Sequence, residues 1–182
     1  MKVSSLSVHL NSSDVVAELC FEYLDKAIAL NPNDIDSLIK RATLMMEKGL
    51  TMEAIGEFEK LEKNSTALET TDLWYHRGQL KFLSGQFGPA VVDYKKAIEL
   101  DPEFIYGHIQ LAVAQYKAGD IGECERGFRR AQKLFENRSE IYHYHGEVLA
   151  DQQNIDVSEK MFDKAIETDP SNPLPLMNKG TL

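Results

Sequence analysis

Apolar residues recur along this chain at intervals of three, four and seven positions, which is the spacing of amphipathic helices. This pattern predicts a first set of helices over residues 36–48, 72–84, 106–118 and 140–152. It predicts a second set over residues 14–30, 52–63, 87–100, 121–134 and 155–168. Each helix of the first set is followed, after a short turn, by one of the second set. The sequence therefore predicts an all-α fold built from antiparallel helix pairs.

Glycine and proline mark the ends of the predicted helices. A glycine follows three helices of the first set by about one residue, where a left-handed backbone is least costly for glycine, at Gly49, Gly85 and Gly119. A proline, which cannot continue a helix, closes three helices of the second set, at Pro32, Pro102 and Pro170. The connection over residues 63–71 is two residues longer than the period allows, and we expect a loop at residues 64–66.

The helix pairs repeat every 34 residues, with one size requirement at each recurring position. Two positions are small throughout, at Ala42, Gly78, Ala112, Gly146 and Gly180 and at Cys20, Ala54, Ala90, Cys124 and Ser158. One position is large and apolar, at Leu24, Phe58, Tyr94, Phe128 and Phe162. Small residues let two helices approach closely, and the large side chain fills the space beside their contact. This pattern is the tetratricopeptide signature, from which Arg77 and Lys81 depart, because Leu and Tyr are expected there.

The period divides the chain into a tetratricopeptide solenoid fragment over residues 1–182. A partial repeat over residues 1–34 is followed by repeats at 35–70, 71–104, 105–138 and 139–172 and by the start of another at 173–182. Residues 1–13 should supply a helix of the first set, yet their serines make a poor one. Because solenoids need polar terminal caps, we interpret the chain as a fragment of a longer array, whose uncapped ends can drive self-association.

The charge and the cysteines exclude several classes of protein. The chain has 20 Lys and Arg against 29 Asp and Glu, a net charge of −9 that argues against a general nucleic-acid binder. No apolar stretch reaches the roughly 18–20 residues of a membrane span, and the N-terminus lacks the apolar core of a secretory signal. Two cysteines form no disulfide framework, which favours a reducing compartment. Both Cys20 and Cys124 occupy the small position and are expected to be buried.

The sequence contains no arrangement typical of an enzyme or a metal site. It has no Gly-x-Ser-x-Gly motif, no Cys–His arrangement and no glycine-rich phosphate loop. His76 and His143 lie two repeats apart, too far for zinc ligands that need bonds near about 2 Å. His143 and His145 point to different sides of a helix. We therefore expect no catalytic residue, no metal and no cofactor.

What remains is a binding surface. In stacked helix pairs one helix of each pair lines a concave groove, and here it is the first. The predicted groove residues are Tyr75, His76, Gln79, Tyr106, Ile109, Gln110, Val113, His143, Tyr144 and Glu147. Aromatic, aliphatic and amide groups dominate the middle of this stripe, and carboxylates lie at its ends. Such a surface favours an apolar or a basic amphipathic protein segment. The alternative is that some of these residues only pack one repeat on the next.

A further use of such grooves, the capture of an acidic chaperone tail, is not expected in this segment. It requires Lys, Arg and Asn side chains that converge on carboxylates from consecutive helices. Here Lys40 and Asn178 lie four repeats apart.

Several stretches add a more specific resemblance. They are YHRGQ at 75–79, HIQLA at 108–112, YKAG at 116–119, GEVLADQQ at 146–153 and PLMNKG at 175–180. Over residues 25–182 they resemble the tetratricopeptide import receptors of the mitochondrial outer membrane, in a fungal version. The resemblance implies a receptor that faces the cytosol, is anchored by an N-terminal membrane helix absent here, and binds precursor proteins through these C-terminal repeats. A generic cytosolic scaffold or co-chaperone, or a regulatory array of an enzyme, remains the alternative.

Overall fold

The protein is described by a computed structural model, which covers the backbone of residues 12–63 and 67–182. Every regular element in these two ranges is a helix. The chain divides into two compact units, one ending at Glu69 and the other running from Thr70 to Leu182. The all-α prediction is confirmed. That the repeats form one continuous array over residues 1–182 stays a prediction.

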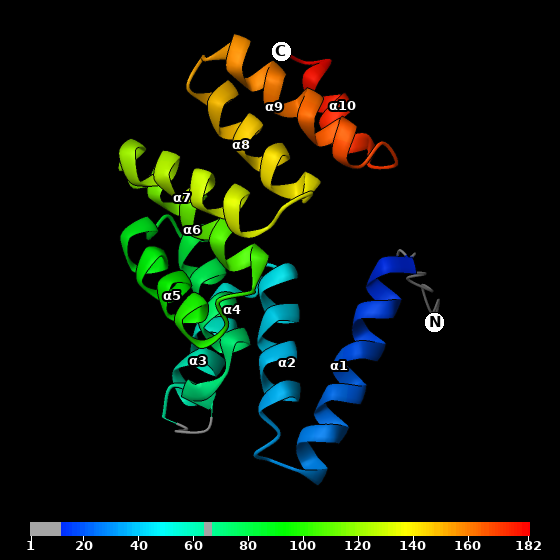
Figure 1. Cartoon of the computed structure of the whole chain (residues 1–182). Coiled ribbons are helices and arrows are strands. Elements are labelled where there is room, and N and C mark those ends of the chain that lie inside the picture. The colour runs from blue at the N-terminus through cyan, green and yellow to red at the C-terminus, as the bar shows by residue number, and fades with distance from the viewer. Residues whose placement is uncertain (1–11, 64–66) are drawn as a thin grey trace. The chain divides into compact units, whose positions relative to one another are not determined.

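The first unit contains three α-helices and a short 3-10 helix (Figure 1). The α-helices are α1 (Ser12–Leu30), α2 (Ile35–Glu47) and α3 (Thr51–Leu61), and the 3-10 helix is η1 (Ala67–Glu69). Successive α-helices pack against each other, and the α2–α3 pair makes the more extensive contact. Ala42 and Phe58 are buried between α2 and α3, as the repeat predicts, and Ile39 is buried as well.

The second unit contains seven helices that follow each other with short turns (Figure 1). The helices are α4 (Thr71–Leu83), α5 (Phe87–Leu100), α6 (Ile105–Lys117), α7 (Ile121–Leu134), α8 (Ser139–Asp151), α9 (Ile155–Thr168) and α10 (Pro173–Lys179). The main contacts join α4 with α5, α6 with α7 and α8 with α9. These are the three predicted helix pairs of this unit.

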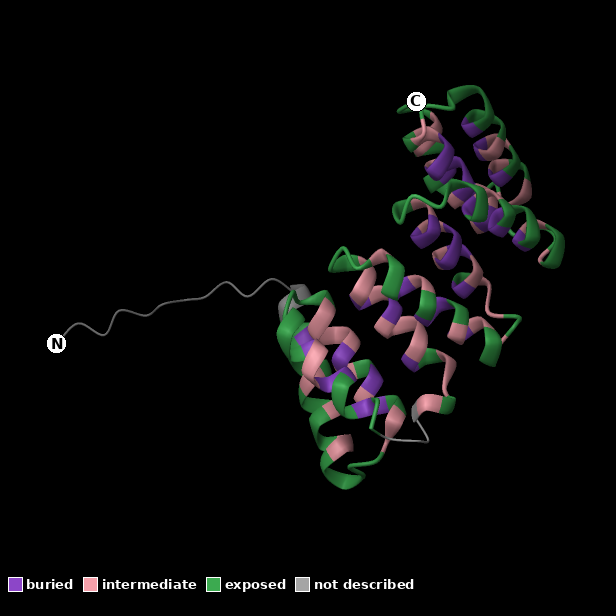
Figure 2. Cartoon of the chain, turned by 90° about the vertical axis from the view of Figure 1, so that its left-hand side faces the viewer, coloured by how far each residue is buried: buried purple, intermediate pink, exposed green. Residues whose placement is uncertain are grey.

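Close approach of the paired helices depends on glycine. A Cβ atom added at Gly78 would lie 2.8 Å from the ring of Tyr94, and one at Gly146 would lie 2.7 Å from the ring of Phe162. Both aromatic rings are buried, and buried residues line the facing sides of the paired helices (Figure 2). The small and large positions of the repeat thus fit against each other within each pair.

Left-handed residues end the first helix of each pair. Gly49, Gly85 and Gly119 have φ angles of 74°, 74° and 90°. At Gly49 the N–H donates to the carbonyl of Met46 at 3.0 Å, and the next N–H donates to that of Met45 at 2.9 Å. These two hydrogen bonds together form a Schellman motif. Gln153 occupies the same place after α8 with a φ of 62°, although it is not glycine.

A buried ionic cluster explains the two departures from the repeat signature. Asp93 on α5 is fully buried, and Arg77 on α4 donates to both of its carboxylate oxygens, from Nε at 2.8 Å and from Nη2 at 2.5 Å. Lys81 Nζ lies 2.7 Å from the same carboxylate, and the guanidinium of Arg77 lies 4.4 Å from the ring centroid of Trp74. Charged residues therefore stand at 77 and 81 because their partner helix carries a buried acid.

Some details differ from the sequence predictions. The first helices of the pairs, α2, α4, α6 and α8, each begin and end one residue earlier than predicted. Cys124 is buried as expected, but the prediction that Cys20 is buried is wrong, because no described helix covers that side of α1. The poor helix expected within residues 1–13 falls largely, and the loop at 64–66 wholly, outside the described residues.

Candidate functional site

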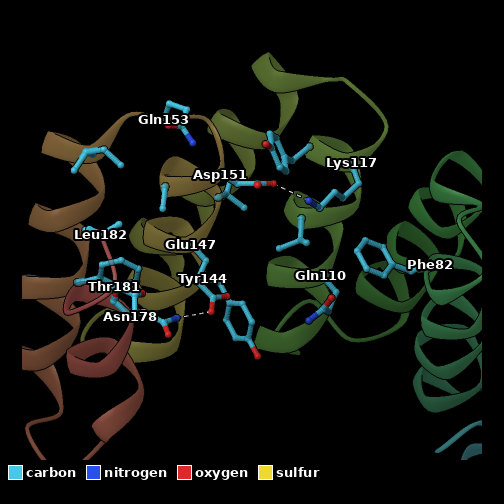
Figure 3. Close-up of a pocket in the computed structure, with 16 residues that line it drawn as sticks. Phe82, Gln110, Lys117, Tyr144, Glu147, Asp151, Gln153, Asn178, Thr181 and Leu182 are labelled. Carbon is cyan, nitrogen blue, oxygen red and sulfur yellow. Dashed lines mark hydrogen bonds and ion pairs between the residues drawn. The ribbon is translucent and has the colours of Figure 1, made fainter.

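A pocket of about 670 Å³ lies in the second unit, along α6, α8 and α10. Figure 3 shows Gln110 and Tyr144 projecting from α6 and α8 into the space that these helices border. The wider lining consists of Phe82, Gln110, Val113, Tyr116, Lys117, Tyr144, Glu147, Val148, Ala150, Asp151, Gln153, Ile155, Phe162, Asn178, Thr181 and Leu182. Apolar and polar groups alternate along it, as in sites that bind a ligand and also orient it.

The structure brings four of the ten predicted groove residues to this pocket, namely Gln110, Val113, Tyr144 and Glu147. Four more lie outside the pocket lining, one on α6 and three on α4. Tyr106 is 44% exposed, and Tyr75, His76 and Gln79 on α4 are half-buried. A short hydrogen-bonded chain orders these α4 side chains, because His76 Nδ1 lies 2.9 Å from Gln79 Oε1 and Gln79 Nε2 donates to the Tyr75 hydroxyl at 3.3 Å.

The prediction that Ile109 and His143 face a ligand is wrong. Ile109 is fully buried and packs in the core with Cys124 and Phe128 of α7. His143 is 6% exposed, and its ring lies 6.0 Å from that of Phe162 on α9. Both residues occupy the same repeat position, which points toward the second helix of the pair, and the half-buried Tyr75 shares this position and packs against Ala90 and Tyr94 of α5. The predicted groove therefore included one position of each first helix that belongs to the core.

Three tyrosines from successive first helices gather in this region. The pKa of Tyr75 is raised to about 12, first by burial and then by the phenol groups of Tyr144 and Tyr106. The ring of Tyr75 contacts Phe104 edge-on at 4.9 Å and lies 5.9 Å from that of Tyr94. The pKa of Tyr144 is also raised, mainly by burial, so the phenols of Tyr75 and Tyr144 are neutral near pH 7 and act as hydrogen-bonding groups on an aromatic surface.

Glu147 contributes a partly exposed carboxylate to the pocket. Asn178 on α10 donates to its Oε1 at 2.6 Å, and His143 Nε2 lies 3.4 Å from the same oxygen. The pKa of Glu147 is lowered, mainly by the hydrogen bond from His143, against the opposing effect of burial. Its side chain remains 42% exposed, so a carboxylate oxygen is accessible to a ligand. Figure 3 shows the bond to Asn178 at one edge of the pocket.

An ion pair forms the opposite edge of the pocket. Lys117 Nζ lies 2.7 Å from Asp151 Oδ2 across α6 and α8 (Figure 3). The pKa of Asp151 is lowered, first by the hydrogen bond from Lys117 and next by the one from Tyr116. Lys117 is the one lysine or arginine of the lining, whereas Glu147 and Asp151 are both acidic. The pocket therefore keeps an excess of negative charge.

The predicted groove did not include most of the other lining residues, among them Phe82, Tyr116 and Lys117. Phe82 and Tyr116 share one repeat position, together with Ala150, in the last turn of α4, α6 and α8. Lys117 continues the stripe one turn beyond Val113. Gln110, Val113 and Lys117 follow Tyr106 at i+4, i+7 and i+11, so the signal for Lys117 was present in the sequence. Tyr116 and its equivalent Phe82 lie at i+10, outside this spacing.

Metal binding and membrane insertion are two further possibilities for the described part of the chain. No three His, Cys, Asp or Glu side chains there gather closely enough to hold a metal ion. Among the helices of residues 12–63 and 67–182, none combines the length and the apolar character that a bilayer span requires.

Three segments match known repeat families. Residues 72–119 match the family described as "TPR repeat". Residues 23–56 and residues 139–172 each match a family described as "Tetratricopeptide repeat". These ranges together span well over half of the chain, and the helix pairs have the packing of this fold. The chain is a tetratricopeptide-repeat protein.

Among the tetratricopeptide-repeat proteins that resemble this chain is a mitochondrial import receptor subunit. It is 34% identical over 169 residues to "Mitochondrial import receptor subunit TOM70" of Saccharomyces cerevisiae, which covers 88% of this chain and 27% of the relative. It is 29% identical over 170 residues to the Rattus norvegicus protein of the same name, covering 87% of this chain and 28% of the relative. The chain thus spans about a quarter of the length of these relatives.

Solved structures with a similar fold include the same receptor subunit. The crystal structure of yeast Tom70 matches with a TM-score of 0.76 and 32% identity, covering 88% of this chain and 34% of that one. A tetratricopeptide-repeat protein of Thermus thermophilus matches with a TM-score of 0.70 at 17% identity, covering 91% of this chain and 89% of that one. The second match supports the fold alone. The first supports a TOM70-like repeat segment.

Proposed function

We propose that this chain is the precursor-binding part of a mitochondrial import receptor. The observation that carries the proposal is the similarity to TOM70, which is named as a mitochondrial import receptor subunit in both yeast and mammals. The resemblance also supports a place on the cytosolic face of the outer membrane, a fungal type of receptor, and binding rather than catalysis. The aromatic, acidic pocket of the second unit is the proposed binding site.

The proposed ligand is an exposed apolar or basic amphipathic segment of a precursor. Val113, Phe82 and Tyr144 offer apolar contact area. Glu147 offers a half-exposed carboxylate to a cation, and the amide of Gln110 can bond to peptide groups. Eight residues make up the proposed groove, Tyr75, His76, Gln79, Tyr106, Gln110, Val113, Tyr144 and Glu147. Release must follow capture, so we expect modest affinity dominated by a fast off-rate.

The proposal is tested by titrating the chain with three labelled peptides and following fluorescence anisotropy. The first peptide is apolar with lysines, the second has each lysine replaced by glutamate, and the third is an acidic chaperone-type C-terminal tail. We expect saturable binding of the first peptide alone, because the pocket is acidic and no carboxylate clamp is expected in this segment. Equal binding of the lysine and glutamate peptides, or preference for the acidic tail, would overturn the proposal.

A further inference from the structure

The exposed face of α7 is basic, although the chain as a whole is acidic. The helix carries four basic and two acidic residues, whereas the net charge of the chain is −9. The four cations follow each other at i, i+3, i+4 and i+7, which places them on one side of the helix. All four are exposed, at Arg126, Arg129, Arg130 and Lys133. The equivalent helix of the next repeat, α9, has the reverse composition, with four acidic and two basic residues. The basic face is therefore specific to α7.

The acidic residues of α7 compensate only part of this charge. Glu123 Oε1 lies 2.7 Å from a guanidinium nitrogen of Arg126, and Glu125 Oε2 lies 3.6 Å from one of Arg129. Among the residues that the structure describes, no carboxylate forms an ion pair with Arg130 or Lys133. These two cations are therefore free to bind an external anion.

Lys95 on α5 extends the basic face beyond α7. By the 34-residue register it corresponds to Arg129, and its side chain is exposed. The pKa of Glu123 is lowered mainly by Arg126 and, to a smaller degree, by Arg130 and Lys95. The α5 lysine thus lies near the α7 carboxylate, and three cations surround that single acid.

The basic face lies on the side of α7 that does not pack against the protein. The opposite side of the helix is buried, with Cys124, Phe128 and Ala131 in the core that α6 shares. None of the residues that line the pocket belongs to α7. The face thus offers charge but no recess for an anchoring side chain, and such recesses carry most of the affinity of protein segments for one another.

The residue types of the face favour phosphate groups. Three of its four α7 cations are arginines, whose planar guanidinium groups bind phosphate oxygens in pairs. Beside Lys133, Leu134 is 59% exposed and provides an apolar group at the edge of the face. Basic residues with an adjacent apolar side chain are typical of helices that lie on a bilayer surface.

We propose that the basic face of α7 binds the surface of a bilayer that contains acidic phospholipids. A bilayer presents many negative charges at once, and each Lys or Arg close to it adds favourable electrostatic energy. Arg130 and Lys133 bind lipid phosphates without losing an existing partner. Because no pocket residue lies on α7, the pocket stays free in the bound state. This inference does not depend on the proposed function.

The test is co-sedimentation of the chain with two kinds of vesicle, one of phosphatidylcholine alone and one that also contains phosphatidylserine. We expect binding to the mixed vesicles only, with a partition coefficient that falls as salt is added, because the attraction is electrostatic. The double variant Arg130→Glu with Lys133→Glu should lower that coefficient at least about tenfold.

The matched control is the double variant Lys160→Glu with Lys164→Glu. It makes the same change of charge at two exposed lysines of α9, at the repeat positions of Arg126 and Arg130. At about 0.15 M salt, charges are screened beyond roughly 8 Å, so a change outside the basic face should lower the coefficient by no more than about twofold. Circular dichroism verifies that both double variants keep their helices.

Four outcomes would overturn the proposal. They are no sedimentation with the mixed vesicles, equal sedimentation with phosphatidylcholine alone, equal losses in the α7 and α9 variants, and selective binding of a soluble polyglutamate peptide. The last outcome, if the α7 variant abolished it while vesicles bound neither chain, would assign the face to an acidic protein segment instead of a bilayer.

Discussion

Arg77 and Asp93 form a bidentate ion pair between α4 and α5, with donor–acceptor distances of 2.8 and 2.5 Å. Asp93 is fully buried, and its carboxylate is paired with both Arg77 and Lys81. A buried carboxylate that is well paired is costly to disturb, because loss of one member leaves a buried charge that this contact no longer compensates. The pair therefore holds the helix that carries Tyr75, His76 and Gln79 against its neighbour.

Removing this carboxylate should destabilise the second unit strongly. We expect Asp93→Ala to lower the free energy of unfolding by about 3–5 kcal/mol, since Arg77 and Lys81 lose their common partner. Trp74, the single tryptophan, lies against Arg77, so its fluorescence during urea unfolding reports on this unit. Asp151→Ala breaks an exposed ion pair and should cost less than about 1 kcal/mol. Similar losses for both variants would show that the buried pair has no special role.

Gly78 should be required because the close packing of α4 on α5 leaves no room for a side chain at this position. In Gly78→Ala the new Cβ would overlap the ring of Tyr94, and we expect a loss of about 1–3 kcal/mol in the free energy of unfolding. Gly88 on α5 has no atom near its missing Cβ, so Gly88→Ala should be neutral or slightly stabilising. Urea unfolding followed by Trp74 fluorescence compares the two. A harmless Gly78→Ala would mean that α4 and α5 are less closely packed than described.

These two predictions show what the sequence could and could not provide. Tyr94 and Gly78 were paired from the 34-residue period, because size requirements at a helix crossing are local and repeat in every pair. Asp93 was not recognised as the partner of Arg77, since a buried charge leaves no periodic signal. Ile109 was placed in the groove because apolar periodicity alone does not say which side faces the neighbouring helix when apolar residues lie on several sides, as on α6. Cys20 was expected to be buried because its repeat position is buried wherever a partner helix is present.

The left-handed turn after α8 offers a stabilising substitution. Gln153 has a φ of 62°, whereas the other three turns use glycine at this place. A left-handed backbone costs a residue with a Cβ roughly 1–2 kcal/mol, and glycine avoids that cost. We therefore expect Gln153→Gly to raise the free energy of unfolding by about 1 kcal/mol. Gln152→Gly, at a φ of −80°, is the control and should give no gain in the same thermal or urea unfolding experiment.

His145 should make the stability of the second unit depend on pH. Its ring stacks on Phe128 at 4.6 Å, and burial lowers its pKa in spite of the nearby carboxylate of Glu125. In the neutral ring Nδ1 can accept from Gln132 Nε2 at 3.1 Å, a bond that protonation of this nitrogen would remove. Because the folded-state pKa is the lower one, the unfolded chain binds this proton first. The contribution of His145 is thus complete above the unfolded value and is lost as the pH falls below it.

The unfolded pKa of histidine is about 6.5, so the loss should begin near this pH. We expect the free energy of unfolding to fall between pH 7 and 5.5, with a slope below the single-group limit of about 1.4 kcal/mol per pH unit. His145→Gln should flatten this slope whatever its effect on stability at pH 7. Urea unfolding at a series of pH values measures both chains. An unchanged slope in the variant would assign the pH dependence to another group.

The groove assignment rests on positions that the structure leaves accessible. These positions lie about one helical turn from buried positions on the same helix. Val113 lies in the pocket on α6, four residues after the buried Ile109. A substitution at Ile109 would disturb the core and confuse folding with binding. Val113 lines the pocket and is only partly buried, although it packs against the same core, so the folding of its variant has to be checked together with binding.

The central claim, that precursor segments bind in this pocket, is tested most directly by comparing Val113→Arg with Val92→Arg. Val92 is 62% exposed on α5 and lies outside the pocket lining, so it controls for the added charge. The measurement is the dissociation constant of one lysine-bearing apolar peptide for the unsubstituted chain and both variants, with folding checked by Trp74 fluorescence. We predict that Val113→Arg weakens binding by at least about tenfold, through lost apolar contact and added repulsion, and that Val92→Arg leaves it unchanged. Equal affinities of the two folded variants would contradict the account.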